Sequence, residues 1–203
     1  MTELISYDSY LKPLGDLPKH ITHVQYLRLR MLPGEHYNSI VLRNRMNKFL
    51  IDRDSLLLDF SFEVGGRIGD LCNVKQADFD FKNMILHLRV KKTKRVIKIN
   101  LTQELCYQIM QFYNIYKKEP FEMSRVNAWL RIKKYGQMIN LNLHPHMFRH
   151  GLAIFLLNNK VPIPIISYRL GHSNVKTTMA YYLKITPEME KFFLENIDFR
   201  GVK

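Results

Sequence analysis

The sequence of 203 residues is poor in several features that mark other classes of protein. It has only two cysteines, Cys72 and Cys106, which lie in apolar patterns and form no CxxC pair, so we expect both to be reduced core residues. The longest purely apolar run, residues 152–157, is far shorter than the roughly 18 residues that a membrane-spanning helix needs. The first eleven residues contain no apolar signal-peptide core. These absences predict a protein that has no membrane partner and stays in the cytoplasm.

Acidic residues are scarce relative to basic ones. The chain has 31 Lys and Arg against 18 Asp and Glu, which gives a formal net charge of +13. This excess indicates a polyanionic partner, either nucleic acid or an anionic membrane surface. Because the basic residues are dispersed, apart from one dense patch, and form no basic amphipathic helix, nucleic acid is favoured. A charge that serves only solubility is the alternative, and the size of the excess disfavours it.

The length and composition predict one compact domain. Hydrophobic residues make up 46% and charged residues 24%, which is typical of a globular protein with a sizeable core. We find no internal repeat, low-complexity segment or linker. Residues 1–19, with Pro13, Gly15 and Pro18, predict a loose arm, and residues 20–203 predict a single domain.

Hydrophobic periodicity predicts a mainly α chain with one small antiparallel sheet, an α+β fold. A first helix capped by Thr22 is expected to bury Val24, Leu27 and Met31 and to end at residues 33–34, Pro-Gly. Further helices are expected at about 39–51, 54–64, 102–118, 124–138, 145–159, 162–169, 174–183 and 187–196.

One stretch in the middle of the chain has the period of a strand pair. Residues 84–90 alternate, with Leu86, Leu88 and Val90 on one face, and residues 96–101 follow after a basic turn. This predicts a β-hairpin. The preceding residues 78–80, Asp-Phe-Asp, are expected to form a turn.

Four clusters of residues are candidates for chemistry, and each has a simpler explanation when taken alone. After Pro145, a helix-start residue, His146, Arg149 and His150 follow at spacings of three and four, which place them on one helix face. A solvated polar face is the simpler explanation of this triplet. A zinc site of His144, His146 and His150 is disfavoured, because neither a cysteine nor a helical His-Glu motif is nearby.

The other three clusters also have ordinary structural explanations. Residues 65–71, Gly-Gly-Arg-Ile-Gly-Asp-Leu, break a helix and contain an Arg and an Asp that can pair on the surface. Residues 89–98 contain six basic residues and no acidic one, as a charged hairpin would. Residues 170–173, Leu-Gly-His-Ser, are typical of a helix end, and the tyrosines at 181 and 182 can be packing residues.

Taken together and in order, the four clusters resemble the catalytic domain of the tyrosine recombinase (phage integrase) family. The order is Gly-x-Arg with an acid three residues on, a basic hairpin, His-x-x-Arg-His, Leu-Gly-His-Ser, and a tyrosine nine residues after that histidine, over about residues 20–197. The resemblance implies six catalytic residues: Arg67, Lys92, His146, Arg149, His172 and Tyr181. Lys91 is the close alternative to Lys92, the spacing selects Tyr181 over Tyr182, and Asp70 takes the position that supports the first arginine.

The resemblance implies a site-specific DNA recombinase that cleaves and rejoins strands through a 3′-phosphotyrosyl intermediate, with no cofactor and no metal. It implies double-stranded DNA as partner, a homotetramer assembled on DNA, a possible accessory DNA-binding protein, and a place at the nucleoid of a prokaryotic or viral host cell. Integration, excision, inversion and resolution all stay open as outcomes. The alternatives are a non-catalytic DNA-binding regulator that retains the fold and a small type IB topoisomerase.

The residue types suit this chemistry independently of the family. Two planar arginine forks can each give two charge-assisted hydrogen bonds to a phosphate and stabilise the charge that develops on its oxygens. A tyrosine hydroxyl, with an ordinary pKa near 10, needs neighbouring groups to withdraw its proton, and histidines can assist. A lysine at a hairpin turn can protonate the leaving 5′ oxygen.

The sequence also departs from the family's usual pattern. Residues 64–67 read Val-Gly-Gly-Arg where Thr-Gly-apolar-Arg is usual, so we expect the extra glycine to loosen Arg67, and Phe148 stands where leucine is usual. Fewer than about 50 residues precede the core, as in the short, single-domain type that resembles fimbrial-switch invertases. This predicts no separate N-terminal DNA-clamp domain. The expected helix 187–196 carries an apolar stripe that can pack either on its own core or on a neighbouring subunit, and the resemblance implies the neighbouring subunit.

Overall fold

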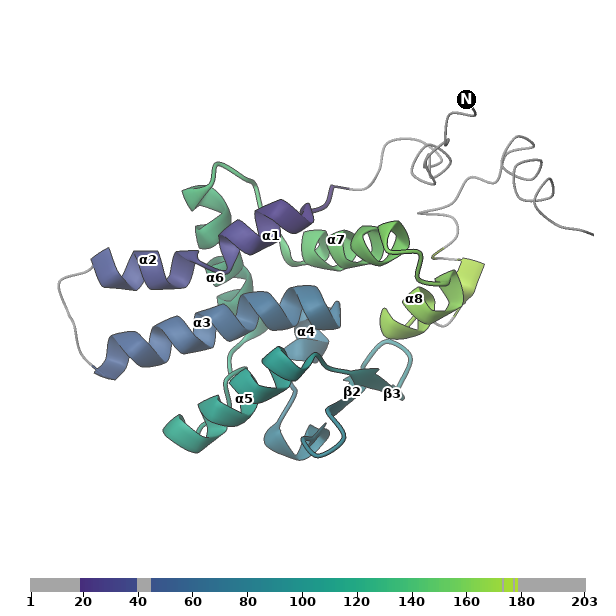
Figure 1. Ribbon diagram of the computed structural model, residues 1–203, viewed down its shortest axis with the longest axis horizontal. Coiled ribbons are helices and arrows are strands. Elements are labelled where there is room, and N and C mark those ends of the chain that lie inside the picture. Colours follow the sequence, from purple (N-terminus) through teal and green to yellow (C-terminus); the bar gives the residue numbers. More distant parts are fainter. Residues whose placement is uncertain (1–18, 40–44, 173, 177, 179–203) are drawn as a thin grey trace, which may run out of the picture.

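The computed structural model describes residues 19–39, 45–172, 174–176 and 178, drawn as coloured ribbon in Figure 1. The predicted arm before residue 19, the predicted helix 187–196 and both tyrosines at 181 and 182 lie outside the described residues. The elements are α1 His23–Leu29, α2 Leu32–Ser39, α3 Arg45–Val64, α4 Ile68–Leu71, the 3₁₀ turn Gln76–Asp78, β1 Phe79–Asp80, β2 Ile85–Val90, β3 Arg95–Asn100, α5 Gln103–Tyr116, α6 Arg125–Met138, α7 Pro145–Asn158 and α8 Ile163–Arg169. The predicted α+β class, mainly helical with a small antiparallel sheet, is confirmed.

The first helix begins where predicted but ends earlier and buries a different face. The Thr22 hydroxyl accepts the Gln25 backbone N–H at 3.1 Å, and the Gln25 side chain accepts the Thr22 N–H at 2.9 Å, a complete capping box. Tyr26 and Leu29 are buried, whereas the predicted face of Val24, Leu27 and Met31 is exposed. The Pro-Gly pair at 33–34 lies in the first turn of α2, where a missing proline N–H costs nothing.

Helix α3 runs unbroken from Arg45 to Val64, so the predicted interruption between residues 51 and 54 is wrong. The polar residues between 51 and 54 suggest a break in the helix, but their side chains form hydrogen bonds and ion pairs with other helices. Asp52 accepts a hydrogen bond from the Tyr116 hydroxyl of α5 at 2.6 Å. No glycine or proline interrupts residues 45–64, so the helical backbone continues through the polar pair.

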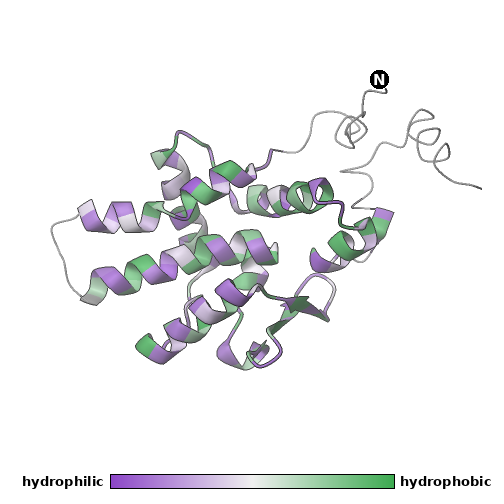
Figure 2. Cartoon of the chain, viewed as in Figure 1, coloured by the Kyte–Doolittle hydropathy of each residue, from purple (hydrophilic) through white to green (hydrophobic). Residues whose placement is uncertain are grey.

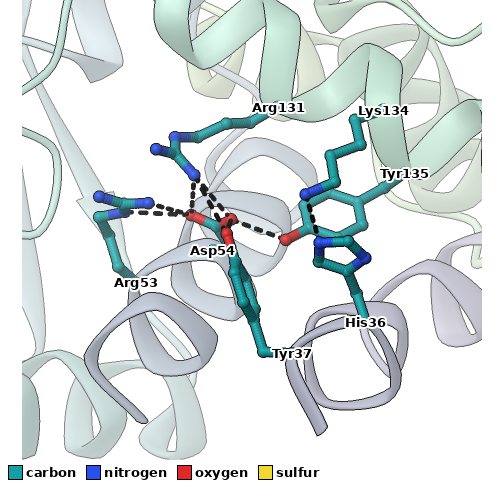
Figure 3. A network of polar contacts seen from close by, with 7 residues as sticks. All are labelled: His36, Tyr37, Arg53, Asp54, Arg131, Lys134 and Tyr135. Atoms are coloured by element: carbon teal, nitrogen blue, oxygen red, sulfur yellow. Dashed lines mark hydrogen bonds and ion pairs between the residues drawn. The ribbon is translucent and has the colours of Figure 1, made fainter. Parts of the chain in front are cut away.

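The Asp54 carboxylate of α3 is the centre of a polar network that joins α2, α3 and α6 (Figure 3). Its side chain is only 1% exposed. It accepts hydrogen bonds from the hydroxyl of Tyr135 at 2.7 Å and that of Tyr37 at 3.2 Å, and it forms ion pairs with Arg131 at 3.0 Å and Arg53 at 2.9 Å. A buried carboxylate satisfied by this many donors fixes the three helices relative to one another.

The sheet has three antiparallel strands in the order β1-β2-β3. The predicted hairpin is confirmed, because β2 pairs with β3 and its residues Leu86, Leu88 and Val90 are all buried. The expected turn at residues 78–80 is in part a strand, since Phe79 pairs with Leu86. A strand of two residues carries almost no periodicity of its own, so only the pairing with β2 reveals it.

Helix α3 separates two apolar cores and supplies side chains to both. Leu56, Phe60 and Val64 pack with the sheet and α5, whereas Leu57 and Leu58 pack with α1, α6 and α7. These residues confirm the prediction that residues 54–64 form the core helix. Figure 2 shows the other helices striped with hydrophobic and hydrophilic residues, as expected for helices that cover a core on one face. Helices α7 and α8 enclose a third, smaller cluster.

Neither cysteine forms a disulfide, and Cys106 is buried while Cys72 is partly buried. In the part of the chain that the structure describes, no helix combines the length and apolar character needed to cross a membrane.

Candidate active site

The carboxyl end of α3 places a backbone carbonyl where it holds Arg149. The helix ends at Val64, and Gly65 has a φ of +65°, a left-handed conformation that favours glycine. A Cβ on Gly65 would lie 2.4 Å from Leu152 Cδ2, so the position also lacks room for a side chain. The Gly65 carbonyl accepts a hydrogen bond from Arg149 Nη1 at 2.8 Å, and Arg149 is only 6% exposed. The helix end therefore fixes the orientation of this guanidinium.

Arg67 directly precedes the short helix α4, with extended backbone (φ −70°, ψ 140°). The glycine before it is closely packed rather than loose, because a Cβ on Gly66 would lie 2.5 Å from Leu71 Cδ2 and 3.1 Å from Leu88 Cδ2. The expectation that the extra glycine loosens Arg67 therefore lacks support from the packing. Gly66 allows the segment to pass close to β2.

Asp70 is buried and binds the hairpin. Its Oδ1 accepts the backbone N–H of Lys91 at 3.1 Å. Among the described residues no ion pair joins Asp70 to Arg67, so the two do not form the surface pair that their spacing allows. The carboxylate instead anchors the start of the β2–β3 turn next to α4.

Helix α7 carries the His-x-x-Arg-His motif on its first two turns. Pro145 occupies the first helical turn, as predicted. Burial lowers the pKa of His146, and the charges of Arg149, His144 and Arg67 lower it further. Burial together with its neighbours, His146 and Arg149 foremost, lowers the pKa of His150 to about 4. Both imidazoles are therefore neutral at pH 7.

His172 follows the end of α8. Gly171 there has a φ of +64°, and the His172 N–H donates to the Ser167 carbonyl at 3.0 Å, which confirms the predicted helix-ending glycine. The Nδ1 atom of His172 lies 2.7 Å from the Thr178 hydroxyl oxygen. Burial lowers the pKa of His172 to about 4, with further lowering, in order, by Arg149, Arg67, His150 and Lys92.

The hairpin is held beside α8, and the charges of its two turn lysines act on different groups. The Tyr168 hydroxyl accepts the Lys98 N–H at 3.1 Å, and Arg169 donates to the Asn100 carbonyl at 3.1 Å. The Lys92 charge acts on His172. The Lys91 charge acts instead on Cys72, whose pKa burial raises to about 11 against the opposing effect of that ammonium. The charge of Lys92, unlike that of Lys91, therefore acts on a histidine of the cluster.

Five of the six residues predicted for the site lie in the described part of the chain, and their charges act on one another. They are Arg67, Lys92, His146, Arg149 and His172. The sixth, Tyr181, lies outside the described residues. His150 belongs to the same cluster. Its spacing of four residues from His146, which places both on one face of α7, was the sequence feature that indicated this. Nothing in the sequence marks Thr178.

A cavity of about 480 Å³ opens beside the cluster, lined among others by His146, Arg125, Trp129 and His144. It leaves room next to the His146 imidazole for part of a ligand. Within residues 19–39, 45–172, 174–176 and 178, no three His, Cys, Asp or Glu side chains are grouped so as to hold a metal ion.

The arrangement suits an anion at which negative charge develops. Guanidinium and ammonium charges act on imidazoles that stay neutral, so the net charge of the cluster is positive. Preorganised cations in a partly desolvated site stabilise the oxygens of a phosphodiester more in the transition state than water does. The neutral imidazoles remain able to donate or accept a proton near pH 7.

Comparison with known proteins agrees with this geometry. A model of the phage integrase family matches residues 41–188. The tyrosine recombinase XerA of Pyrococcus horikoshii is 32% identical over 141 residues, which cover 64% of this chain and 50% of the relative. A tyrosine recombinase of Pseudothermotoga lettingae is 29% identical over 195 residues, covering 82% of this chain and 68% of the relative.

Solved structures share the fold. The crystal structure of XerA recombinase superposes with a TM-score of 0.67 at 19% identity, over 93% of this chain and 67% of that one. XerH site-specific recombinase bound to its difH substrate, a pre-cleavage complex, also gives 0.67, at 16% identity over 91% of this chain and 56% of that one. The chain spans about half the length of the first curated relatives that it matches. Since the family model matches well over half of its 203 residues, the chain belongs to the phage integrase family of tyrosine recombinases.

Proposed function

We propose that this chain carries out site-specific recombination, cleaving and rejoining double-stranded DNA through a 3′-phosphotyrosyl link to Tyr181, without a metal or cofactor. The observation that carries the proposal is that Arg149, held by the Gly65 carbonyl, and the charges of Arg67 and Lys92 act together on the half-buried His172. Membership of the phage integrase family supports it. So does the fold likeness to recombinases solved in complex with DNA.

The two arginines bind the non-bridging oxygens of the scissile phosphate. Arg149 is preorganised for this, because the Gly65 carbonyl fixes its Nη1. Arg67 directly precedes α4. Contacts that strengthen as charge builds on phosphorus accelerate the chemical step rather than merely tightening DNA binding.

The bonds change in two balanced steps. The Tyr181 oxygen attacks phosphorus while its proton passes to the neutral imidazole of His146. The bond from phosphorus to the 5′ oxygen breaks, and that oxygen takes a proton to leave as a hydroxyl. The reverse attack by a 5′ hydroxyl restores the phosphodiester and releases the tyrosine, so strands are resealed without ATP.

Lys92 supplies the proton to the leaving 5′ oxygen. The charge of Lys92 acts on His172, whereas that of Lys91 acts on Cys72, and this difference supports Lys92 over Lys91. The hydrogen bond from the Lys91 N–H to Asp70 anchors the turn from which Lys92 projects. A 5′-bridging phosphorothiolate tests the role, because its thiolate leaves with little need of a proton. We expect this substrate to rescue Lys92→Ala but not Arg149→Ala. Lys91→Ala should cleave the ordinary substrate normally and therefore needs no rescue. Rescue of Lys91→Ala alone would move the role by one residue.

Trapping on nicked suicide substrates tests the proposal as a whole. The wild-type chain should form a covalent adduct with a cognate site, and peptide mapping should place it at Tyr181. Tyr182→Phe is the matched control and should still form the adduct, whereas Tyr181→Phe should not. An adduct that survives Tyr181→Phe would contradict the assignment. Relaxation of a supercoiled plasmid without a site would instead identify a topoisomerase.

We further propose that recombination requires a homotetramer on two DNA sites, at the nucleoid of a prokaryotic or viral host. Residues 20–203 act as a single catalytic domain in this assembly. An accessory protein adds DNA contacts where needed. A lambda integrase dimer bound to a core site, solved with the same fold, supports assembly on DNA. Light scattering with and without DNA should give an assembly only on DNA. Truncation after Thr186 should reduce recombination more than single-site binding. A truncated chain that recombines normally would contradict a role of the last segment in assembly.

A further inference from the structure

Thr178 is a buried polar residue that the site described so far does not use. Its side chain is 0% exposed, and its hydroxyl oxygen lies 2.7 Å from Nδ1 of His172, six residues earlier. A hydroxyl removed from water needs partners for both its proton and its lone pairs. Within the described part of the chain, the imidazole nitrogen of His172 is the hydrogen-bond partner of this hydroxyl.

The direction of this hydrogen bond decides which ring nitrogen carries the proton. If Nδ1–H donated to the oxygen, the hydroxyl proton would be left in a fully buried place without an acceptor, at a cost comparable to a lost hydrogen bond. If the hydroxyl donates to the Nδ1 lone pair, its proton is satisfied. The neutral ring then carries its own proton on Nε2.

We infer that Thr178 is a positioning residue, whose hydroxyl holds His172 in the Nε2–H form so that this N–H is preorganised to donate to an oxygen of the scissile phosphate. In the free protein the charges of Arg149 and Arg67 act on this ring, and a bound anion would offset them. The role rests on the proposed recombination chemistry. It makes His172 a neutral hydrogen-bond donor at working pH rather than an acid.

The same hydrogen bond joins two motifs of the site. It links His172, at the end of α8, to the segment that continues in sequence to Tyr181, three residues after Thr178. A change at Thr178 should therefore disturb the chemical step while leaving the many phosphate contacts of the basic chain intact.

The test compares Thr178→Val, which keeps the shape and removes the hydroxyl, with Thr178→Ser, which keeps the hydroxyl. Single-turnover adduct formation should slow by about tenfold in the valine variant, since one oriented hydrogen bond is lost, and should stay near wild type in the serine variant. Binding of the same DNA should change little in both. A valine variant that cleaves at the wild-type rate, or a serine variant as slow as valine, would overturn the role.

A second measurement does not depend on cleavage. Nitrogen-15 NMR of the imidazole in the full wild-type chain should show Nε2 protonated and Nδ1 as acceptor, and the valine variant should lose this preference. A wild-type ring protonated on Nδ1 would overturn the inference, even if the valine variant failed to fold. A wild-type chain that showed the expected form but gave no adduct on any site would instead contradict the proposed function.

Discussion

Replacing Gly65 by alanine should damage stability and the active site together. Gly65 lies at the end of α3 with a φ of +65°, and a Cβ there would lie 2.4 Å from Leu152 Cδ2 and 3.2 Å from Leu170 Cδ2. Both leucines belong to the small core between α7 and α8. The added methyl group must therefore push α3 away from this core or force the two side chains out of their rotamers.

The expected cost follows from two effects that add. A side chain in the left-handed conformation costs about 1–2 kcal/mol, and overpacking of a closed core costs about 1–3 kcal/mol. The sum of about 2–5 kcal/mol is a large part of the roughly 5–15 kcal/mol by which domains are usually stable, so a domain near the middle of that range keeps most of its molecules folded. In those molecules the Gly65 carbonyl no longer holds Arg149 Nη1 in place, so cleavage should fall more than DNA binding.

Urea unfolding followed by circular dichroism measures the first effect, and single-turnover cleavage the second. Gly34→Ala is the matched control, because Gly34 lies in α2 and a Cβ there meets nothing within 4 Å. Its replacement should stabilise the helix by about 0.5–1 kcal/mol. A free energy of unfolding for Gly65→Ala within about 0.5 kcal/mol of wild type would refute the reasoning, since surface substitutions alone produce changes of that size.

Two further substitutions test the polar supports of the fold and of the hairpin. Asp54→Asn should lower the free energy of unfolding by about 3–5 kcal/mol, because the positive charge of Arg131 then has no counter-charge. Asp52→Asn should lower it by about 1 kcal/mol, because it weakens a single hydrogen bond. Equal losses in urea titrations would argue against the network in Figure 3. Asp70→Ala should speed amide hydrogen exchange at the Lys91 N–H and slow cleavage, and unchanged exchange there would mean that the carboxylate does not anchor the turn.

The parts of the fold that could be predicted are those with local signals. The capping box at Thr22 and the alternation of Leu86, Leu88 and Val90 depend only on neighbouring residues, and both are present in the structure. The continuity of α3 could not be predicted, because the partner of Asp52 is Tyr116, 64 residues away. Tertiary contacts of this kind override local polarity.

The candidate site divides in the same way. Linear motifs locate the arginines and histidines, because their spacing along one helix or turn is fixed by backbone geometry. The choice between Lys91 and Lys92 depends on the conformation of a four-residue turn, which the sequence does not specify. In the structure the charge of Lys91 acts on Cys72 and that of Lys92 acts on His172. The hydrogen bond of Thr178 to His172 needs the chain to turn back after α8, so no spacing rule anticipates it.

Neutral histidines amid cations give the site a pH dependence whose sign can be worked out. In the folded chain His172 has a pKa of about 4, mainly through burial and then through Arg149, whereas an unfolded histidine titrates near 6.5. As pH falls below about 6.5 the unfolded chain takes up the proton first, so the free energy of unfolding decreases toward pH 4. At pH 5 this amounts to about 2 kcal/mol by linkage, and solvent screening of a partly exposed ring reduces it to about 1 kcal/mol.

Asp59 provides a control of opposite sign within the same chain. Burial raises its pKa to about 6, against the effect of Arg30, so here the folded chain takes up the proton first and the free energy of unfolding rises as pH falls from about 6 toward 4. Urea unfolding at pH 7.5 and pH 5 should therefore show a smaller acid-induced loss for His172→Gln than for wild type, and a larger loss for Asp59→Asn. Comparing each variant with itself at the two pH values removes the constant cost of the substitution. Shifts of the same sign in both variants would contradict the assignment of a neutral, desolvated His172 among cations.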